Sequence, residues 1–173
     1  MGAWGAGSFE NDTAMDFLDE FADAPDGLGD DDEPGKVMMI LEMLATVDAA
    51  STDMDDMPEG DEDEDDEEAP YLESDLACGT IVMAEVLAAI YGKPHPEFAS
   101  SDEELASAVV GRWARTKGVK EKRLADHATR ELAIRAISKI RDAGELHDLW
   151  SDAEPADKKA WQAAMSDLLA RLK

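Results

Sequence analysis

The stretch 76–91 constrains the fold more than any other part of the sequence, because it is apolar on every side. Within it only Thr80 and Glu85 are strongly polar. Ser74 can cap a helix here, and Gly92 can end it. A helix that is apolar all round must be covered by other elements on every face. The stretch therefore predicts a buried central helix.

The remaining helices are predicted from apolar residues that recur at helical spacing. They fall in five further segments: 12–21, 37–49, 101–113, 120–143 and 155–172. The segment 120–143 is expected to be the longest helix, and a short turn is expected at 146–150. No long stretch alternates with period two, which argues against strands. We predict an all-α fold, a compact multi-helix bundle in which residues 1–173 form a single helical domain.

Charge is distributed very unevenly along the chain. The net charge is -26, and residues 1–77 hold 27 of the 42 acidic residues but only one base, Lys36. Residues 78–173 are electrically balanced, with 15 acids and 15 bases. The densest part is 53–68, where 12 of 16 residues are acidic. Blocks of like charge repel themselves, so residues 51–70 are predicted to be an acidic, low-complexity, disordered loop.

The acidic loop has two interpretations. It is either a solvated linker that keeps the protein soluble, or an anionic surface that attracts a basic protein. On the second interpretation the partner-binding residues are the eight consecutive acids at its centre: Asp61, Glu62, Asp63, Glu64, Asp65, Asp66, Glu67 and Glu68.

The chain opens with a glycine-rich motif, "MGAWGAGSFEND". A phosphate-binding loop would follow a strand and usually carry a lysine. Here no strand is expected before residue 2, and the first lysine is Lys36. We therefore expect a structural role. The glycines would let the backbone pass close to neighbouring helices. The large ring of Trp4 and a helix cap by Asn11 or Asp12 would anchor the segment. The residues assigned to this motif are Trp4, Gly5, Gly7, Phe9, Asn11 and Asp12.

No catalytic or metal-binding pattern is recognisable. The histidines His95, His127 and His147 are scattered, and Cys78 is the only cysteine, so zinc motifs are incomplete. We predict no catalytic residue, no metal and no cofactor. No run of about 18 apolar residues and no secretory signal is present. With a lone cysteine, these features predict a cytoplasmic protein that does not bind membranes.

Glu85 is the one candidate for buried chemistry. A carboxylate in the most apolar helix must be paired, hydrogen-bonded or protonated. The Trp4 indole and Arg112 are possible partners, and the sequence does not choose between them. If Glu85 instead faces a pocket, the protein would be a small-ligand-binding or hydrolytic domain.

Basic residues concentrate in residues 112–141, which hold ten bases and three acids. Alone, this segment suggests nucleic-acid binding, but the charge of -26 argues against a polyanionic partner. We expect the two halves of the chain to attract each other, with the acidic loop contacting the basic segment.

Three stretches carry a resemblance to a known family: "MGAWGAGSFENDTAMDFLDEF", "MAEVLAAIYGKPHP", and "ELHDLW" followed by "WQAAMSDLLARL". The chain resembles the uncharacterised bacterial family catalogued as domain of unknown function 4259. The resemblance implies a compact bacterial domain without naming an activity. From the uneven distribution of charge we expect a non-enzymatic interaction module that binds a basic protein. An immunity or toxin-neutralising role follows by analogy with other small acidic bacterial proteins.

Overall fold

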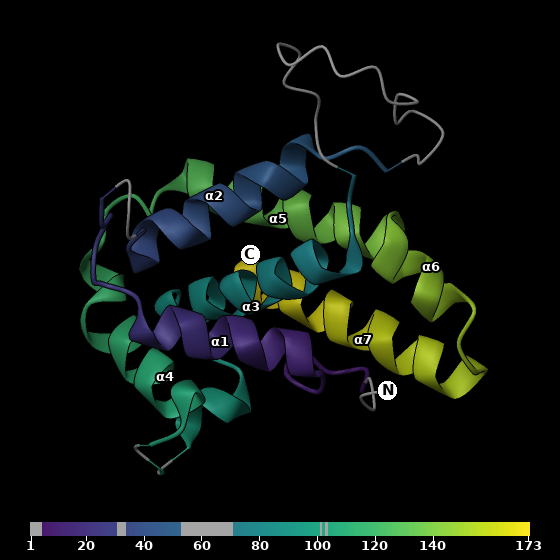
Figure 1. Ribbon diagram of the computed structural model, residues 1–173, viewed down its shortest axis with the longest axis horizontal. Coiled ribbons are helices and arrows are strands. Elements are labelled where there is room, and N and C mark those ends of the chain that lie inside the picture. Colours follow the sequence, from purple (N-terminus) through teal and green to yellow (C-terminus); the bar gives the residue numbers. More distant parts are fainter. Residues whose placement is uncertain (1–4, 31–33, 53–70, 101, 103) are drawn as a thin grey trace.

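The structure is a computed structural model that describes residues 5–30, 34–52, 71–100, 102 and 104–173. This part of the chain is all-α and contains no strand, as predicted (Figure 1). Its elements, in chain order, are α1 (Asp12–Asp23), α2 (Lys36–Ala49), α3 (Ser74–Ile90), η2 (Pro96–Ala99), α4 (Ala106–Thr116), η3 (Gly118–Lys120), α5 (His127–Asp142), α6 (Glu145–Ser151) and α7 (Pro155–Leu172).

Helix α3 is the centre of the fold. Every residue from 77 to 90 is buried, and α3 contacts each of the other α-helices of the described chain. Figure 1 shows α3 in the middle, with α1 and α2 along its flanks and α7 beside it. At Gly79 a Cβ atom would overlap the side chains of Met43 and Phe17, so the glycine lets α1 and α2 approach α3 closely. The prediction of a buried central helix is confirmed.

Helix boundaries in the second half differ from the predicted ones. Helix α4 begins at Ala106 rather than near residue 101, and α5 begins at His127 rather than near residue 120. The Asp126 side chain accepts a hydrogen bond from Ala128 N at 3.0 Å and so caps α5. Residues just before this cap are held out of the helix, because Thr129 donates to Arg123 O at 2.6 Å. Consequently α5, with 16 residues, is shorter than α7, which with 18 residues is the longest helix in the described part of the chain.

The opening motif folds back on itself. Gly5 N donates to Glu10 O at 3.1 Å, and Gly7 N donates to the Glu10 carboxylate at 2.7 Å. A Cβ at Gly5 would overlap the Glu10 side chain. At Gly5 and Gly7 the close contact is therefore with Glu10 in a local turn rather than with a neighbouring helix.

The anchors of this motif are partly as predicted. The Asn11 side chain accepts a hydrogen bond from Ala14 N at 2.7 Å and caps α1, whereas Asp12 is the exposed first residue of the helix. The Phe9 ring packs edge-on against His95 and Phe98, with centroids 5.0 and 5.3 Å apart. Trp4 lies outside the described residues. Through Phe9 and Asn11 the motif is thus anchored to η2 and to the start of α1.

Ion pairs join the two halves of the described chain. Arg135 on α5 contacts Asp48 on α2 through two hydrogen bonds of 2.9 and 3.0 Å. Lys139 donates to the Asp48 carbonyl at 2.6 Å at the carboxyl end of α2, where cations are favoured. Lys117 pairs with Asp26 in the α1–α2 connection. The basic segment is therefore partly neutralised by acids of the first half.

Candidate functional site

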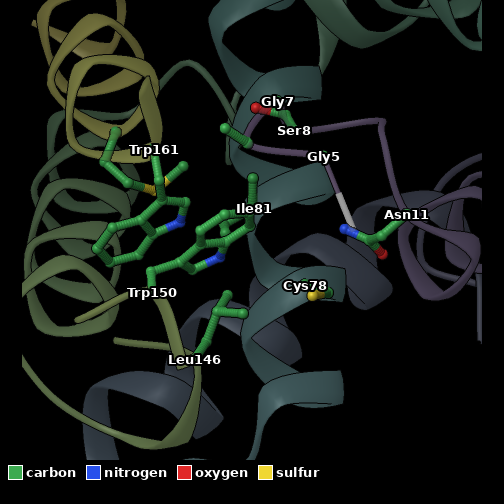
Figure 2. Close-up of a pocket in the computed structure, with 11 residues that line it drawn as sticks. Gly5, Gly7, Ser8, Asn11, Cys78, Ile81, Leu146, Trp150 and Trp161 are labelled. Carbon is green, nitrogen blue, oxygen red and sulfur yellow. The ribbon is translucent and has the colours of Figure 1, made fainter. Parts of the chain in front are cut away.

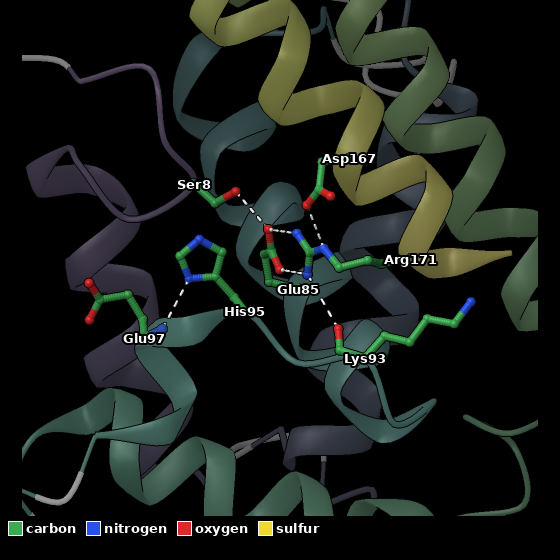
Figure 3. Close-up of polar contacts among 7 residues, drawn as sticks. All are labelled: Ser8, Glu85, Lys93, His95, Glu97, Asp167 and Arg171. Carbon is green, nitrogen blue, oxygen red and sulfur yellow. Dashed lines mark hydrogen bonds and ion pairs between the residues drawn. The ribbon is translucent and has the colours of Figure 1, made fainter.

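Glu85 is fully buried, with 0% of its surface exposed, and lies in an internal ion pair. Arg171 near the end of α7 donates to both carboxylate oxygens, at 2.6 and 2.7 Å (Figure 3). Ser8 of the opening motif donates its hydroxyl to Glu85 Oε1 at 2.8 Å. Two-point arginine–carboxylate contacts of this kind are strong and geometrically specific.

The Arg171 guanidinium is held by more than Glu85. Its Nε donates to Asp167 at 2.7 Å, and its side chain is 16% exposed. Burial lowers the pKa of Arg171, but hydrogen bonds and negative charges from Glu85 and Asp167 outweigh this and raise its pKa above the ordinary value. The group stays charged and ties together the opening motif, α3 and α7.

Trp4 and Arg112 were the possible partners of Glu85. Trp4 lies outside the described residues, and within them the contacts to Glu85 come from Ser8 and Arg171. Arg171 is 86 residues away in sequence, and no spacing pattern signals a contact at that distance. The prediction that the carboxylate must be paired is correct. Both oxygens accept hydrogen bonds inside the fold, so the geometry offers no support for Glu85 as a catalytic acid or base.

Beside the opening motif lies a small pocket, shown in Figure 2. It is lined by Gly5, Gly7, Cys78 and the stacked rings of Trp150 and Trp161, whose centroids are 6.3 Å apart. Its volume is about 10 Å³, roughly the space of a single water molecule. Burial raises the pKa of the Cys78 thiol to about 12. This space cannot hold a substrate, and the thiol is not activated.

A much larger groove opens between the start of α3, α6 and the start of α7. We call it the acidic groove; its lining residues are Ser74, Glu145, Leu149, Trp150, Ala153, Glu154 and Asp157. Its volume is about 630 Å³. The floor is apolar, formed by Leu149, Trp150 and Ala153, and Leu149 is 52% exposed.

A second pocket of about 380 Å³ continues the groove through the shared residues Ser74 and Glu145. It adds Tyr71, Glu73 and Asp75 to the lining. Together the two carry five carboxylates and no basic residue: Glu73, Asp75, Glu145, Glu154 and Asp157. The combined surface is negatively charged around an apolar floor, and the name acidic groove is used below for both pockets together.

Helix geometry explains why carboxylates gather there. The groove lies at the amino-terminal ends of α3 and α7, where helix dipoles favour negative charge. The Glu145 carboxylate accepts a hydrogen bond from Ser74 N at 2.7 Å and so serves the start of α3. Asp75 accepts from the Thr13 hydroxyl at 3.3 Å. Glu73, Glu154 and Asp157 are exposed at the rim.

The predicted partner-binding acids, Asp61 to Glu68, lie outside the described residues. The two ends of their segment are nonetheless placed: Ser51 and Tyr71 form a bridge, and Leu72 N donates to Ser51 O at 2.8 Å. Tyr71 also lines the second pocket. The acidic loop therefore begins and ends at the edge of the acidic groove.

Sequence reasoning did not find this groove. Leu149 and Trp150 were expected only as apolar residues of a short turn. The lining comes from three segments up to 86 residues apart, from Tyr71 to Asp157. No His, Cys, Asp and Glu cluster suited to a metal ion occurs among the described residues. None of the helices in this part of the chain has the length and apolar character needed to span a membrane.

These features define an all-α protein with a buried ion pair at its centre and an acidic groove on its surface. The chain belongs to the family described as domain of unknown function (DUF4259), whose model matches residues 2–63 and 41–164. No curated protein and no solved structure matches the chain.

Proposed function

We propose that this protein is a non-enzymatic interaction module that binds a basic protein through the acidic groove and the adjoining acidic loop. The observation that carries the proposal is the pairing of five carboxylates with an exposed apolar floor in one concave surface. Acidic residues alone would be explained by their place at solvent-exposed helix starts. Leu149 adds an anchor that charge alone does not explain.

The groove and the loop have different tasks in this proposal. The loop raises the local concentration of a basic partner and speeds encounter. The groove then receives an apolar side chain flanked by lysine or arginine, with Leu149 and the edge of Trp150 as the contact surface. A central apolar anchor inside a polar rim is the usual anatomy of a binding interface.

Toxin neutralisation, as by an immunity protein, is one biological form of this activity. A basic toxin would be a suitable partner, because it would be attracted to a protein with a charge of -26. The partner class we propose is thus a basic protein. Nucleic acid and membranes are not proposed as partners.

The test compares two variants of equal net charge. The groove variant carries Glu73→Gln, Glu154→Gln and Asp157→Asn, which leave the structural hydrogen bonds of Glu145 and Asp75 intact. The control variant carries Asp16→Asn, Asp19→Asn and Glu20→Gln, which neutralise three exposed carboxylates of α1. Each variant, and the unchanged protein, is used to capture partners at low salt, and any captured protein is purified and bound again.

We expect a discrete basic partner that binds the unchanged protein and the control variant but not the groove variant. Equal binding of the partner to the two variants would refute the proposal that the acidic groove is the binding site. Binding should weaken steeply towards 0.5 M salt, where the Debye length falls to roughly 4 Å.

The loop is tested separately by replacing residues 53–70 with a short glycine–serine linker. The bridge between Ser51 and Tyr71 holds the two ends together, so the helices should be undisturbed. At low salt the association rate should fall by about tenfold or more, with little change in the dissociation rate. An unchanged association rate would leave the loop with only a solubilising role.

A further inference from the structure

Residues 5–10 of the opening motif form a unit that is held together largely by its own hydrogen bonds. Gly5 N donates to Glu10 O at 3.1 Å, Glu10 N donates to Gly7 O at 3.2 Å, and Gly7 N donates to the Glu10 carboxylate at 2.7 Å. These bonds are kept if the unit moves as a whole. We call residues 5–10 the lid segment.

The side chains of Ser8 and Phe9 tie the lid segment to the helices. Ser8 is buried and donates its hydroxyl to the Glu85 carboxylate at 2.8 Å (Figure 3). The Phe9 ring is half-buried and packs edge-on against the rings of His95 and Phe98. The hydrogen bond from Ser8 to Glu85 is therefore the polar contact that fixes the lid segment over α3.

Lifting the lid segment breaks this hydrogen bond without leaving a buried charge unpaired. Arg171 still donates to both Glu85 oxygens after Ser8 has left. One hydrogen bond to a charged group corresponds to a factor of roughly ten to a hundred in an equilibrium constant. Segments held by so few contacts open locally while the rest of the domain stays folded. Asn11, which caps α1, marks the point about which the lid segment can swing.

The lid segment covers the small pocket that Cys78, Trp150 and Trp161 line from the other side (Figure 2). Trp150 also lines the acidic groove, so this ring separates the small pocket from the groove. It is only 9% exposed and lies nearly parallel to the Trp161 ring, with 12° between the two planes. Because protein interiors are close-packed, the support on one side of a buried ring helps to fix the surface that its other side offers.

We propose that the lid segment is a latch that regulates the acidic groove through Trp150. In the closed state Ser8 is bonded to Glu85, and the lid segment supports Trp150 at the floor of the groove. In the open state residues 5–10 swing away, Cys78 becomes accessible, and Trp150 loses this support, so the groove binds its partner less tightly. A partner that prefers the closed state therefore holds the lid segment shut. The coupling rests on the function proposed for the groove, whereas the motion of the lid segment does not.

The motion is tested by labelling Cys78, the only cysteine, with a thiol reagent in urea concentrations well below the unfolding transition. Local opening exposes little surface, so the slow labelling rate should hardly depend on urea in this range. Ser8→Ala should raise the rate by roughly tenfold or more. The control Ser166→Ala removes an exposed hydroxyl of α7 and should leave the rate within about twofold. A rate that follows global unfolding at every urea concentration, or equal rates in the two variants, would overturn the lid.

The coupling is tested with Ser8→Asp, because a second carboxylate beside Glu85 repels it and favours the open state. The control Ser166→Asp adds the same charge at an exposed position. In protein labelled with ¹⁵N at tryptophan, the Trp150 indole resonance, assigned through Trp150→Phe, should shift in Ser8→Asp and stay in place in the control. An unchanged Trp150 resonance in Ser8→Asp, with Cys78 labelled rapidly, would overturn the coupling. Circular dichroism checks folding, and Ser8→Ala serves if Ser8→Asp does not fold.

The partner obtained by capture gives the last comparison. Ser8→Asp should bind it about fivefold or more weakly than Ser166→Asp, a ratio typical of coupled sites. Equal affinities would overturn the regulation of the groove. Failure to capture any partner would count against the function proposed for the groove, and the Cys78 and Trp150 measurements, made on the protein alone, still decide whether the lid segment opens and moves the groove floor.

Discussion

Removing the Arg171 guanidinium should be one of the most damaging single changes in the protein. In Arg171→Met the fully buried Glu85 carboxylate keeps only the Ser8 hydroxyl as a hydrogen-bond donor among the contacts described above. An uncompensated buried charge of this kind costs about 3–5 kcal/mol. In Glu85→Gln the cost should be smaller, about 1–3 kcal/mol, because Arg171 retains Asp167 and some solvent access.

The double variant Glu85→Leu with Arg171→Met tests the reasoning most sharply. It removes both charges and keeps roughly the same volume, so the desolvation cost disappears together with the attraction. Its free energy of unfolding should lie within about 1–2 kcal/mol of the unchanged protein. With Glu85→Leu as the second single variant, at a cost similar to that of Glu85→Gln, the two sites should show a coupling energy of at least about 2 kcal/mol, towards the upper end of the range for residues in contact.

The assay is urea unfolding followed by circular dichroism, with linear extrapolation to water. For a chain of 173 residues, 3–5 kcal/mol corresponds to a fall in Tm of roughly 6–20 °C. Lys159→Met, an exposed position on the same helix, is the control and should change stability by less than about 0.5 kcal/mol. A cost below about 1 kcal/mol for Arg171→Met, or additive effects in the double variant, would refute a buried, mutually dependent pair.

Three further outcomes follow from local geometry. Asn11→Ala should lower the free energy of unfolding by about 1 kcal/mol by removing the α1 cap, and an unchanged urea midpoint would contradict this. Gly144→Ala should lower the free energy of unfolding more than Gly92→Ala. Both glycines have positive φ, but only at Gly144 would a Cβ approach Leu72, at 2.8 Å. Equal urea midpoints for the two variants would argue against crowding at Gly144. Cys78 should resist alkylation at pH 8 unless urea is added. The free energy of unfolding should fall as pH rises from about 9 towards about 12, because the Cys78 thiol ionises at a lower pH in the unfolded chain than in the folded protein.

The core of the fold could be predicted because one helix has no polar face. The stretch around Glu85 is buried throughout. A helix with apolar residues on every side can only be stable where other helices cover all of its faces. Helix starts in the second half were less predictable. They depend on local hydrogen bonds, such as the Asp126 cap and the bond from Thr129 to Arg123, which compete with helical spacing.

The site was less accessible to sequence reasoning than the fold. The need for a partner of Glu85 follows from burial alone, but the choice of Arg171 depends on how α7 packs against α3. Leu149 looks like a core residue by its spacing from Leu146, yet on α6 it is Leu146 and Trp150 that are buried while Leu149 lies exposed. Only the packed structure brings it beside the carboxylates at the starts of α3 and α7.

The central claim is that a basic partner binds in the acidic groove, and amide hydrogen exchange tests it most directly. Exchange is measured on the full chain, alone and with the partner obtained by capture. Binding in the groove predicts slower exchange in residues 71–78 and 145–157, with little change in α4. Slower exchange confined to α1 or α4, with those two segments unchanged, would contradict the account.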